Sequence, residues 1–305
     1  MLKKCKDITV LLLTMIAVFK IYLYTMYPAL KNGDAAEIIA SGYTLGINHP
    51  PGYPLFSMMA KIFSYLPLGS PAFRIDLFTE FLALIVLFFS FYLIKQNIRF
   101  FFGCENKIVN FIGVFILAFS YIFWNQAIDA KGGIYLLNLL FLAIMVYLSI
   151  ELFKAFNIKY LYLMSYIYGL SLSNHWPSMI ILLPVFGYLF FKYRKKINLK
   201  RLYYIIIFLI LGFTPYIYLP IRSATDGIFA FVIKTTSWES FWWTILRTAY
   251  DNTAPSSTLQ LYINQVEEFL TLFVNDFSFM WVIVFFGLYS LWKKTEKFYF
   301  FIQAY

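Results

Sequence analysis

The sequence has little charge, and this shortage excludes most soluble folds. Only 13% of its 305 residues are charged, which is about half the share of an average soluble domain. Hydrophobic residues make up 61% of the chain and aromatic residues 22%. So few charges cannot cover a surface that faces water, so the extra apolar surface is expected to face lipid.

Cysteine and histidine are also scarce. Cys5 and Cys104 are far apart and have no spacing typical of a disulfide framework or a thiolate metal site. The sequence lacks a glycine-rich phosphate loop, a Gly-x-Ser-x-Gly segment and a His-Glu-x-x-His segment. Nucleotide hydrolysis and zinc proteolysis therefore have no support. The only two histidines, His49 and His175, become candidates for chemistry.

Long apolar runs dominate what is present, and a bilayer requires about 20 apolar residues per helix. The runs predict spans at 8–28, 76–94, 108–124, 134–153, 160–173, 177–191, 202–219 and 277–292, with a ninth beginning at Phe298. We therefore expect an all-α, multi-pass integral membrane protein with about 8–9 helices and a single polytopic domain over residues 1–305. The first run has no small-residue cleavage site after it and is interpreted as an uncleaved helix. The chain ends inside an apolar run, which suggests an N-terminal fragment of a longer protein.

Basic residues predict the orientation of the chain. If the N-terminus is cytoplasmic, 17 of the 25 basic residues fall on the cytoplasmic side: Lys3, Lys4, Lys6, Lys95, Arg99, Lys107, Lys154, Lys159, Lys192, Arg194, Lys195, Lys196, Lys200, Arg201, Lys293, Lys294 and Lys297. This is the positive-inside bias of membrane proteins. It accounts for the net charge of +10 without a nucleic-acid partner.

Acidic residues show the opposite bias. Eleven of the 15 fall on the outer side, since only Asp7, Glu105, Glu151 and Glu296 fall inside. Acidic residues contribute little to topology, so insertion does not explain this excess. Chemistry is therefore expected in the outer segments, which are 29–75, 125–133, the turn at Asn174-His175-Trp176, and 220–276. Within the first, residues 50–68 are amphipathic and rich in proline, which suits an interfacial or re-entrant segment.

The first outer loop contains Gly33-Asp34-Ala35-Ala36-Glu37. Asp34 and Glu37 have the spacing of a capping box, and the local sequence favours a capped helix. Residues three apart also share a helix face. Two carboxylates there can accept a proton from a hydroxyl or bind a divalent cation.

The same loop continues with His49-Pro50-Pro51-Gly52-Tyr53-Pro54. Three prolines impose a rigid, non-helical path. A rigid loop that carries a histidine beside an acidic segment suits a binding site. The alternative is a turn that leads into the interfacial segment, with His49 on the surface.

Four further outer residues are candidates, each with a structural alternative. Asp129 is a third carboxylate, and Asn174 and His175 lie at a break between two short spans, where polar groups usually face a cavity. Arg222 can clamp a phosphate or extend to lipid headgroups. An amphipathic stretch with Trp238, Trp242, Trp243, Arg247 and Tyr250 follows, typical of an aromatic belt or of a surface that holds a lipid carrier.

Seven segments occur in the order of a known family. They are Gly33-Asp34-x-x-Glu37, Tyr43-Thr44-Leu45-Gly46-Ile47, His49-Pro50-Pro51-Gly52-Tyr53-Pro54-Leu55, Arg74-x-Asp76-Leu77-Phe78, Trp124-x-Gln126-Ala127, Asn174-His175 and Leu219-Pro220-Ile221-Arg222. Over residues 30–225 the chain resembles a bacterial membrane family, domain of unknown function 2723. That family is related to the eukaryotic transmembrane protein O-mannosyltransferase (glycosyltransferase family 117, GT-C superfamily).

The resemblance implies a GT-C-like helical bundle that transfers a sugar from a polyprenyl-phosphate carrier. It implies Asp34 as the general base, assisted by Glu37. His49, Tyr53, Asp129, Asn174, His175 and Arg222 would line the donor and acceptor pocket, with Arg222 at the lipid phosphate. No metal ligand is assigned, and a divalent cation stays an open alternative.

The sequence departs from the family pattern in three places, one of which is its end inside an apolar run, where family proteins continue with more spans. Where the family has an Ala-Glu-Val-Tyr-like stretch, this chain has Ala130-Lys131-Gly132-Gly133-Ile134-Tyr135. Because a lysine stands where the family has an acid, the pattern does not predict a second-acid or metal-binding role there. No Asn-Trp-Gly-Asp-Pro-like segment follows Arg222.

We therefore expect a glycosyltransferase, with mannose as one candidate sugar. It would act on a protein or glycan acceptor at the outer face of the cytoplasmic membrane. The alternative is a transporter or flippase for a lipid-linked or small polar substrate, because broken spans also suit transporters. The absence of an internal repeat favours the enzyme, as does the finding that only Lys20 lies clearly inside a span.

Overall fold

A computed structural model describes residues 2–26, 33–103, 106–250 and 259–277, together with residues 282, 285–287 and 289. These residues form helices, and the only β-pairing among them is one isolated bridge. The α-helices are α1 (Leu2–Thr25), α2 (Asp34–Thr44), α3 (Pro54–Phe63), α4 (Pro71–Phe102), α5 (Lys107–Phe119), α6 (Tyr121–Ala127), α7 (Ala130–Lys154), α8 (Ile158–Met179), α9 (Leu183–Tyr193), α10 (Leu199–Phe213), α11 (Tyr218–Ser223), α12 (Trp238–Leu246) and α13 (Leu259–Phe277). Short 3₁₀ turns lie at Ile180–Leu182, Arg194–Lys196, Thr214–Ile217 and Thr248–Tyr250.

Several long helices begin at side-chain caps that the sequence supplies. Ser70, Asn106, Asn157 and Asn198 each accept a hydrogen bond from a backbone N–H in the first turn of α4, α5, α8 and α10. Such caps satisfy amide groups that have no partner inside the helix. Each cap stabilises its helix by about 1 kcal/mol.

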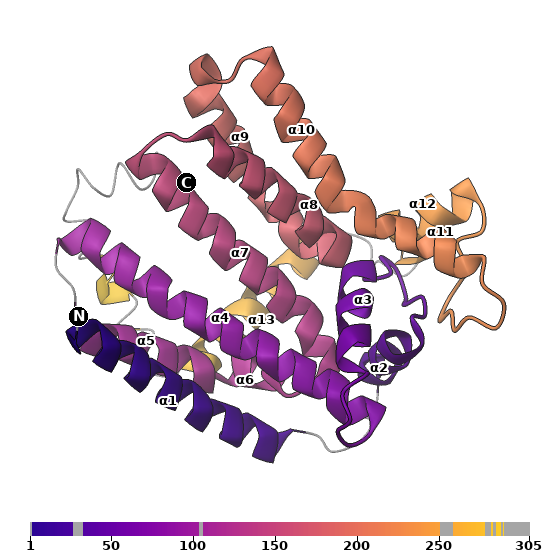
Figure 1. The fold of residues 1–305 in the computed structure, drawn as a ribbon, viewed down its shortest axis with the longest axis horizontal. Coiled ribbons are helices and arrows are strands. Elements are labelled where there is room, and N and C mark those ends of the chain that lie inside the picture. Colours follow the sequence, from indigo (N-terminus) through magenta and orange to yellow (C-terminus); the bar gives the residue numbers. More distant parts are fainter. Residues whose placement is uncertain are drawn as a thin grey trace.

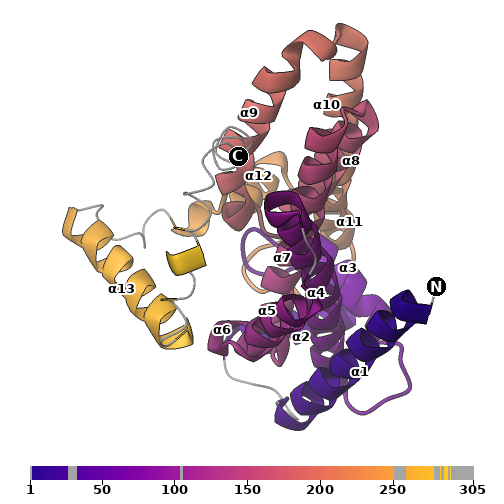
Figure 2. The same cartoon turned by 90° about the vertical axis from the view of Figure 1, so that its left-hand side faces the viewer.

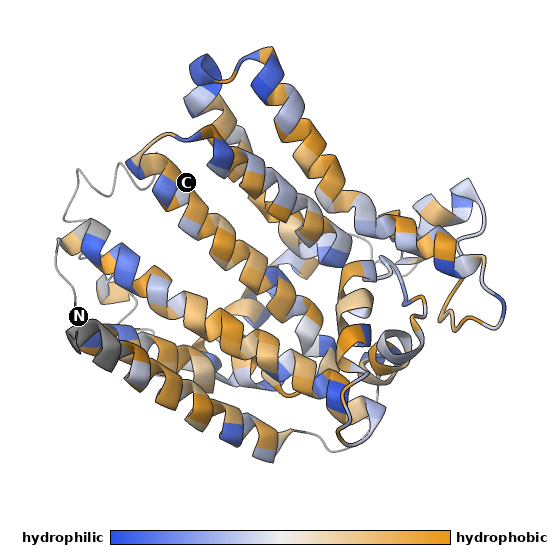
Figure 3. Ribbon diagram, in the orientation of Figure 1, coloured by the Kyte–Doolittle hydropathy of each residue, from blue (hydrophilic) through white to orange (hydrophobic). Residues whose placement is uncertain are grey.

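Five helical stretches are long and apolar enough to cross a bilayer: Ile8–Thr25, Pro71–Arg99, Ala130–Lys154, Ile158–Lys196 and Leu199–Ser223. A sixth is formed if α5 and α6, which meet at a 66° bend, are one span. The chain is therefore a helical membrane protein. Apolar residues fill the middle of these helices, and hydrophilic residues gather at their ends (Figure 3).

The expected span at 108–124 corresponds to two helices, α5 and α6, which meet at a 66° bend at Ser120. Ser120 has extended backbone angles, and its side chain accepts a hydrogen bond from the N–H of Phe123. This cap starts a new helix in a new direction. The expected spans at 277–292 and from Phe298 fall mostly outside the described residues, as does Cys104.

The expected turn at Asn174-His175-Trp176 is confirmed within the stretch 158–196. His175 has non-helical backbone angles, and the chain folds back so that α9 packs against α8. The rings of Tyr168 and Phe186 are 4.5 Å apart, and Leu161 shares a buried cluster with Leu189. The two arms thus correspond to the expected short runs at 160–173 and 177–191.

The helices that surround the first outer loop gather at one end of the bundle. In Figure 1, α4, α7, α8 and α10 run across the molecule, and α2, α3, α11 and α12 lie together beside one end of them. Helix α13 stands to one side of the bundle (Figure 2), tied to α6 by a hydrogen bond from the Ile122 N–H to Asp276 Oδ1 (3.0 Å). The expected interfacial segment at 50–68 contains the short apolar helix α3.

Candidate functional site

The acidic segment does not form the capping box that its spacing predicted. Gly33 is the N-cap of α2, with a φ of 86°, and makes no side-chain cap bond. Asp34 is the first helical residue. Because a φ in this region favours glycine, the turn at Gly33 moves the cap position one residue upstream and leaves both carboxylates available for other partners.

Glu37, His49 and Tyr53 form a hydrogen-bonded chain. The backbone N–H of His49 donates to Glu37 Oε1 (2.6 Å), and His49 Nδ1 lies 2.7 Å from Glu37 Oε2. On the other side of the ring, Nε2 lies 2.7 Å from the Tyr53 hydroxyl. A carboxylate only accepts hydrogen bonds, so Nδ1 carries the proton, and a neutral ring accepts from Tyr53 at Nε2. Burial raises the pKa of Tyr53 far above its usual range, which keeps its hydroxyl protonated.

Tyr53 has a strained backbone conformation in this position. Its φ of 42° is in the left-handed region although it precedes Pro54, and such a conformation costs about 1–3 kcal/mol for a non-glycine residue. Gly52, with a φ of 93°, precedes it. The loop is therefore bent tightly so that the Tyr53 ring turns back onto His49, and the two ring centroids are 5.1 Å apart.

The large outer loop covers the histidine loop. Ile47 forms a parallel β-bridge with Ala230, through hydrogen bonds from its N–H to Phe229 O (2.8 Å) and from the Phe231 N–H to its carbonyl (2.9 Å). A Cβ on Gly46 would collide with Phe229. Segments nearly 200 residues apart are thus joined next to His49, whose ring also lies 6.2 Å from that of Phe231.

Asp34 lies at the accessible edge of this cluster and forms an ion pair with Lys131. The distance from Lys131 Nζ to Asp34 Oδ2 is 2.7 Å, and the side chains are 44% and 41% exposed. The Glu37 side chain, by contrast, is only 2% exposed. The hydrogen bond from Lys131 holds the pKa of Asp34 below its usual value. Asp34 is therefore an accessible, ionised carboxylate beside a buried one.

Helix α7 brings Lys131 to Asp34 by its close approach to α6 and α3. Asp129 caps α7, accepting a hydrogen bond from the Lys131 N–H (3.0 Å). A Cβ on Gly132 would collide with the Gln126 backbone, and one on Gly133 would collide with Phe56. Residues 131–133, which depart from the family pattern, therefore allow α7 to pack closely against α6 and α3.

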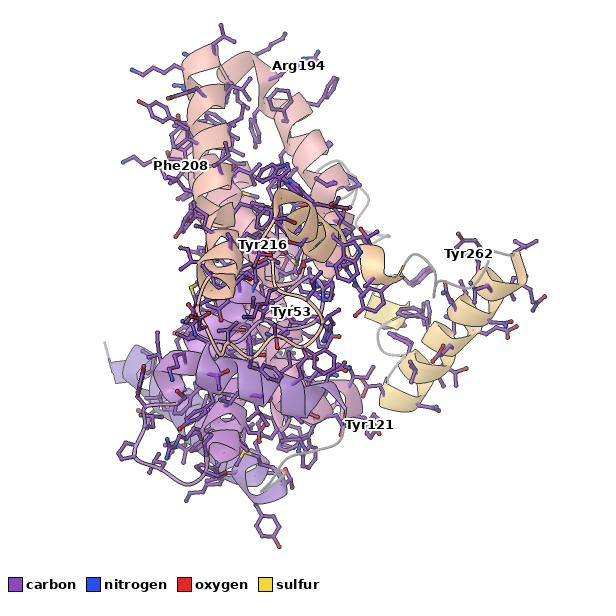
Figure 4. All side chains as sticks on the ribbon, turned by 90° about the vertical axis from the view of Figure 1, so that its right-hand side faces the viewer. Tyr53, Tyr121, Arg194, Phe208, Tyr216 and Tyr262 are labelled. Carbon is purple, nitrogen blue, oxygen red and sulfur yellow. The ribbon has the colours of Figure 1, made fainter. Side chains whose placement is uncertain are left out.

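His175 lies against Tyr53 at the break in α8. The two rings are stacked with centroids 5.8 Å apart, and Tyr135 meets His175 edge-on at 5.5 Å. His175 Nδ1 lies 3.0 Å from Ser178 Oγ. Figure 4 shows Tyr53 in the middle of the molecule, between the N-terminal helices and the arm that carries Arg194.

Asn174 fastens this break to α7. Its Nδ2 donates to Ile134 O and to Asn138 Oδ1, both at 2.8 Å. Asn138 in turn donates to His175 O (2.8 Å) and Ser178 Oγ (2.7 Å). Asn138 thus satisfies the carbonyl of His175 at the break, and the two buried amides together tie this turn to α7.

Arg222 lies on the far side of the same loop. Its Nε donates to Leu45 O (2.8 Å) and its second terminal nitrogen to Thr44 O (3.1 Å). Tyr218 donates to Gly46 O nearby (2.7 Å). Both side chains tie α11 to the C-terminal end of α2, and the guanidinium group complements the dipole of that helix.

Arg247, at the end of α12, is a second basic residue of this region. It adopts a left-handed conformation with a φ of 63°, and its guanidinium lies 4.6 Å from the Tyr250 ring. Burial raises the pKa of the Tyr53 hydroxyl, and the charge of Arg247 acts in the opposite direction. Helix α12 is held to the α8 break because the Trp176 indole N–H donates to Ile245 O (2.7 Å).

A divalent cation has candidate ligands here, because Asp34, Glu37 and His49 offer ligand atoms within 4.8 Å of one another. Both Glu37 oxygens, however, accept hydrogen bonds from His49, and Lys131 neutralises Asp34. A cation would have to displace these bonds, so the present arrangement fits proton transfer better than metal binding.

The predicted residues Asp34, Glu37, His49, Tyr53 and His175 are thus brought together. Three other predicted residues lie around them. Asp129 caps α7, Asn174 ties the break in α8 to α7, and Arg222 ties α11 to the end of α2. Lys131, Tyr135, Ser178 and Arg247 also belong to this region but were not among the predicted site residues. A basic residue beside an acidic loop was a usable signal for Lys131, but no spacing indicated that α12 packs on the α8 break.

Together, these features define a helical membrane protein with a carboxylate–histidine–tyrosine cluster at one end of its bundle. The sequence profile of the protein O-mannosyl-transferase TMEM260 N-terminal domain matches residues 34–199, which is more than half of the chain. The chain belongs to this family. The match begins at Asp34 and includes Glu37, His49, Tyr53 and His175, but ends before Arg222 and Arg247.

Two relatives are eukaryotic. The protein O-mannosyl-transferase TMEM260 of Mus musculus is 28% identical over 214 residues, which cover 68% of this chain and 29% of that protein. The protein of the same name from Dictyostelium discoideum is 26% identical over 277 residues, covering 85% of this chain and 32% of that protein. The chain thus spans about a third of the length of these relatives. No solved structure matches it. The expected relation to the eukaryotic mannosyltransferase is confirmed, and the bacterial family stays a prediction.

Proposed function

We propose that this chain is the catalytic membrane portion of a GT-C-type glycosyltransferase that transfers mannose from a polyprenyl-phosphate carrier to a protein hydroxyl. The observation that carries the proposal is the accessible Asp34 carboxylate beside the buried Glu37–His49–Tyr53 chain, at one end of a helical membrane bundle. The names of the relatives support the sugar and the acceptor.

In the proposed reaction, Asp34 takes the proton of the acceptor hydroxyl. The acceptor oxygen forms a bond to C1 of the sugar as the bond between C1 and the phosphate oxygen breaks, and polyprenyl phosphate leaves. Asp34 suits the role of base because it is ionised and accessible. Lys131 holds the carboxylate in place, and Glu37 orients His49 through two hydrogen bonds. Positioned acid–base groups typically contribute 10²–10⁴-fold to rate.

For the donor phosphate we propose Arg247 ahead of the predicted Arg222. Arg222 donates to two backbone carbonyls, whereas the Arg247 guanidinium lies over the Tyr250 ring. Arginine is well suited to phosphate because its planar fork matches two phosphate oxygens. Lengthening of the bond to the leaving phosphate would be stabilised by this charge.

An apolar cavity of about 410 Å³ beside Tyr135 suits the carrier lipid. Its lining includes Leu136, Leu139, Phe269 and Phe273, so it lies between α7 and α13. Tyr135 also borders His175. A chain bound there would place its phosphate end toward the cluster.

The test uses membranes that contain this chain, incubated with radiolabelled polyprenyl-phosphate mannose and membrane proteins as acceptors. We expect label in protein for the wild type and a loss of at least about 10²-fold for Asp34→Asn, with unchanged amounts of folded protein. Equal labelling by Asp34→Asn would overturn the assignment of the base. Movement of the labelled lipid across the bilayer without transfer would instead favour the flippase alternative.

A further inference from the structure

Three residues of the candidate site meet the distance requirement of a divalent cation. Among the described residues, Asp34, Glu37 and His49 form the one group of three or more acidic, histidine or cysteine side chains whose ligand atoms lie within 4.8 Å of one another. Oxygen ligands bind Mg²⁺ and Ca²⁺ at about 2.0–2.6 Å, so two ligands of one ion are at most about 4–5 Å apart. Carboxylates suit Mg²⁺, Ca²⁺ and Mn²⁺, and imidazole suits several transition metals. By distance and donor type, this group fits a single ion.

The bonds inside this group are only a partial obstacle to an ion. His49 has to give up the contact between its Nδ1 and Glu37 Oε2 before that nitrogen can bind a metal. Each Glu37 oxygen, however, retains a second lone pair beside the one that His49 uses. The Asp34 side chain is 41% exposed, so it is open to ions from solution. The stronger obstacle is therefore the partner of Asp34.

Lys131 is that partner, and its charge has the same sign as that of a metal ion. Its Nζ lies 2.7 Å from Asp34 Oδ2, so an ion bound to Asp34 would be within a few ångströms of the ammonium group. Like charges at such distances repel one another even near a protein surface. Because an exposed ion pair contributes at most about 1 kcal/mol, the lysine side chain can turn aside, but its charge stays close to the site.

The fold holds Lys131 at this position in helix α7. Its backbone N–H donates to Asp129 Oδ1 (3.0 Å) in the cap of the helix. A Cβ on the next residue, Gly132, would lie 2.0 Å from Gln126 O, so the start of α7 is pressed against α6. The lysine backbone is thus fixed, and only its side chain can move. A positive charge beside Asp34 is therefore a result of how α6 and α7 pack.

We propose that Lys131 acts as a built-in cation that keeps the group of Asp34, Glu37 and His49 closed to divalent metal ions. Removing its charge then opens a metal site on these three residues, and a glutamate in its place adds a further carboxylate ligand. The closure is a property of the folded chain and is independent of the transfer reaction. One consequence rests on the proposed function, namely that mannose transfer by the wild type requires no divalent cation at Asp34.

The experiment measures Mn²⁺ binding to the purified full chain in a mild detergent, through the loss of the electron paramagnetic resonance signal of free Mn²⁺. The site variants are Lys131→Gln and Lys131→Glu. The matched control is Lys234→Gln, which removes the same charge from an exposed position in the large outer loop. A double variant, Lys131→Gln with Asp34→Asn, removes the charge together with an expected ligand.

We expect the wild type and Lys234→Gln to bind Mn²⁺ equally weakly. Lys131→Gln should bind it about 10–100-fold more tightly, the range over which groups bonded to metal ligands alter metal affinity. Lys131→Glu should bind more tightly still, because it adds a charged oxygen ligand. The double variant should return to the wild-type affinity, which would identify Asp34 as a ligand of the ion.

Equal affinity of the wild type and both Lys131 variants would overturn the proposal, and so would an equal gain in Lys234→Gln, which would mean a general charge effect. Thermal unfolding of each variant verifies that the fold is intact, as expected for the loss of an exposed ion pair. In the labelling assay, wild-type transfer should persist in EDTA, and a loss that Mn²⁺ reverses would also overturn the proposal. Absence of labelling under every condition would instead contradict the proposed function, and Mn²⁺ binding would still decide whether Lys131 closes the site.

Discussion

At the residue scale, the ion pair between Lys131 and Asp34 controls the charge of the proposed base. The hydrogen bond from Lys131 lowers the pKa of Asp34, so the pair stabilises the fold above the pKa of an unfolded aspartate. That contribution is lost as the pH falls through the lower folded value. Since both side chains are more than 40% exposed, the pair contributes at most about 1 kcal/mol.

We therefore expect Lys131→Met to raise the pKa of Asp34 and to move the acidic limb of the transfer rate to higher pH. The rate at neutral pH should change less than in Asp34→Asn, because the base is still present. Lys234→Met, an exposed change in the large outer loop, is the control. The measurement is the pH profile of label transfer. An acidic limb that stays in place would show that Asp34 does not titrate in it.

Removing the Tyr53 hydroxyl tests the Glu37–His49–Tyr53 chain. Tyr53→Phe keeps the ring that stacks on His175 but removes the hydrogen bond to His49 Nε2. We expect transfer to fall by about 10²-fold and stability by about 1 kcal/mol. Tyr216→Phe removes another buried hydroxyl, bonded to Leu172 O, and should have a similar stability cost with normal transfer. Equal activity of the two variants would argue against a role for the chain in chemistry.

The sequence could predict which residues meet here but not how they are bonded. Acidic residues and both histidines on one side of the membrane indicated a common site. The capping box failed because its spacing does not show whether the turn before it is made by Gly33 or by Asp34. Arg222 illustrates a second limit. The sequence around an arginine at a membrane boundary does not show whether its guanidinium binds a phosphate or backbone carbonyls.

At the element scale, glycines determine how closely helices approach. A Cβ on Gly132 would collide with the Gln126 backbone, whereas Gly187 in α9 has open space around it. Gly132→Ala should destabilise the protein by about 1–3 kcal/mol, because α6 and α7 must separate, and should also weaken transfer by displacing Lys131. Gly187→Ala should leave stability unchanged or raise it by about 0.5–1 kcal/mol. Thermal unfolding in detergent measures both, and a normal melting temperature for Gly132→Ala would contradict the packing argument.

Helix positions were predictable from apolar runs, but helix directions were not. Hydropathy places the run at 108–124 correctly yet cannot show the bend at Ser120, because a serine in an apolar run caps one helix or continues another with equal ease. The turn at His175 was predictable, since two short runs flanked a polar tripeptide with a following proline. The hydrogen bond from Asn138 to His175 O was not predictable, because Asn138 lies within an apolar helix 37 residues away.

At the scale of the whole molecule, the charge bias predicts which side of the membrane each end of the bundle faces. With Cys5 and Cys104 replaced by serine, a single cysteine at Asp226 should react with a membrane-impermeant thiol reagent in intact cells. A cysteine at Lys195 should react only after permeabilisation. The measurement is labelling of the purified protein. The opposite result would invert the topology and place the Asp34 cluster in the cytoplasm.

The bridge between Ile47 and Ala230 can form only late in the synthesis of the chain. During synthesis at about 5–20 residues per second, residues 229–231 emerge on the order of 10–40 s after Ile47. Glu37 and His49, only 12 positions apart, can pair as soon as the first loop is translocated. The covering segment and Arg247 arrive later. A nascent chain would thus pair its carboxylate and histidine before the segment that covers them has been made.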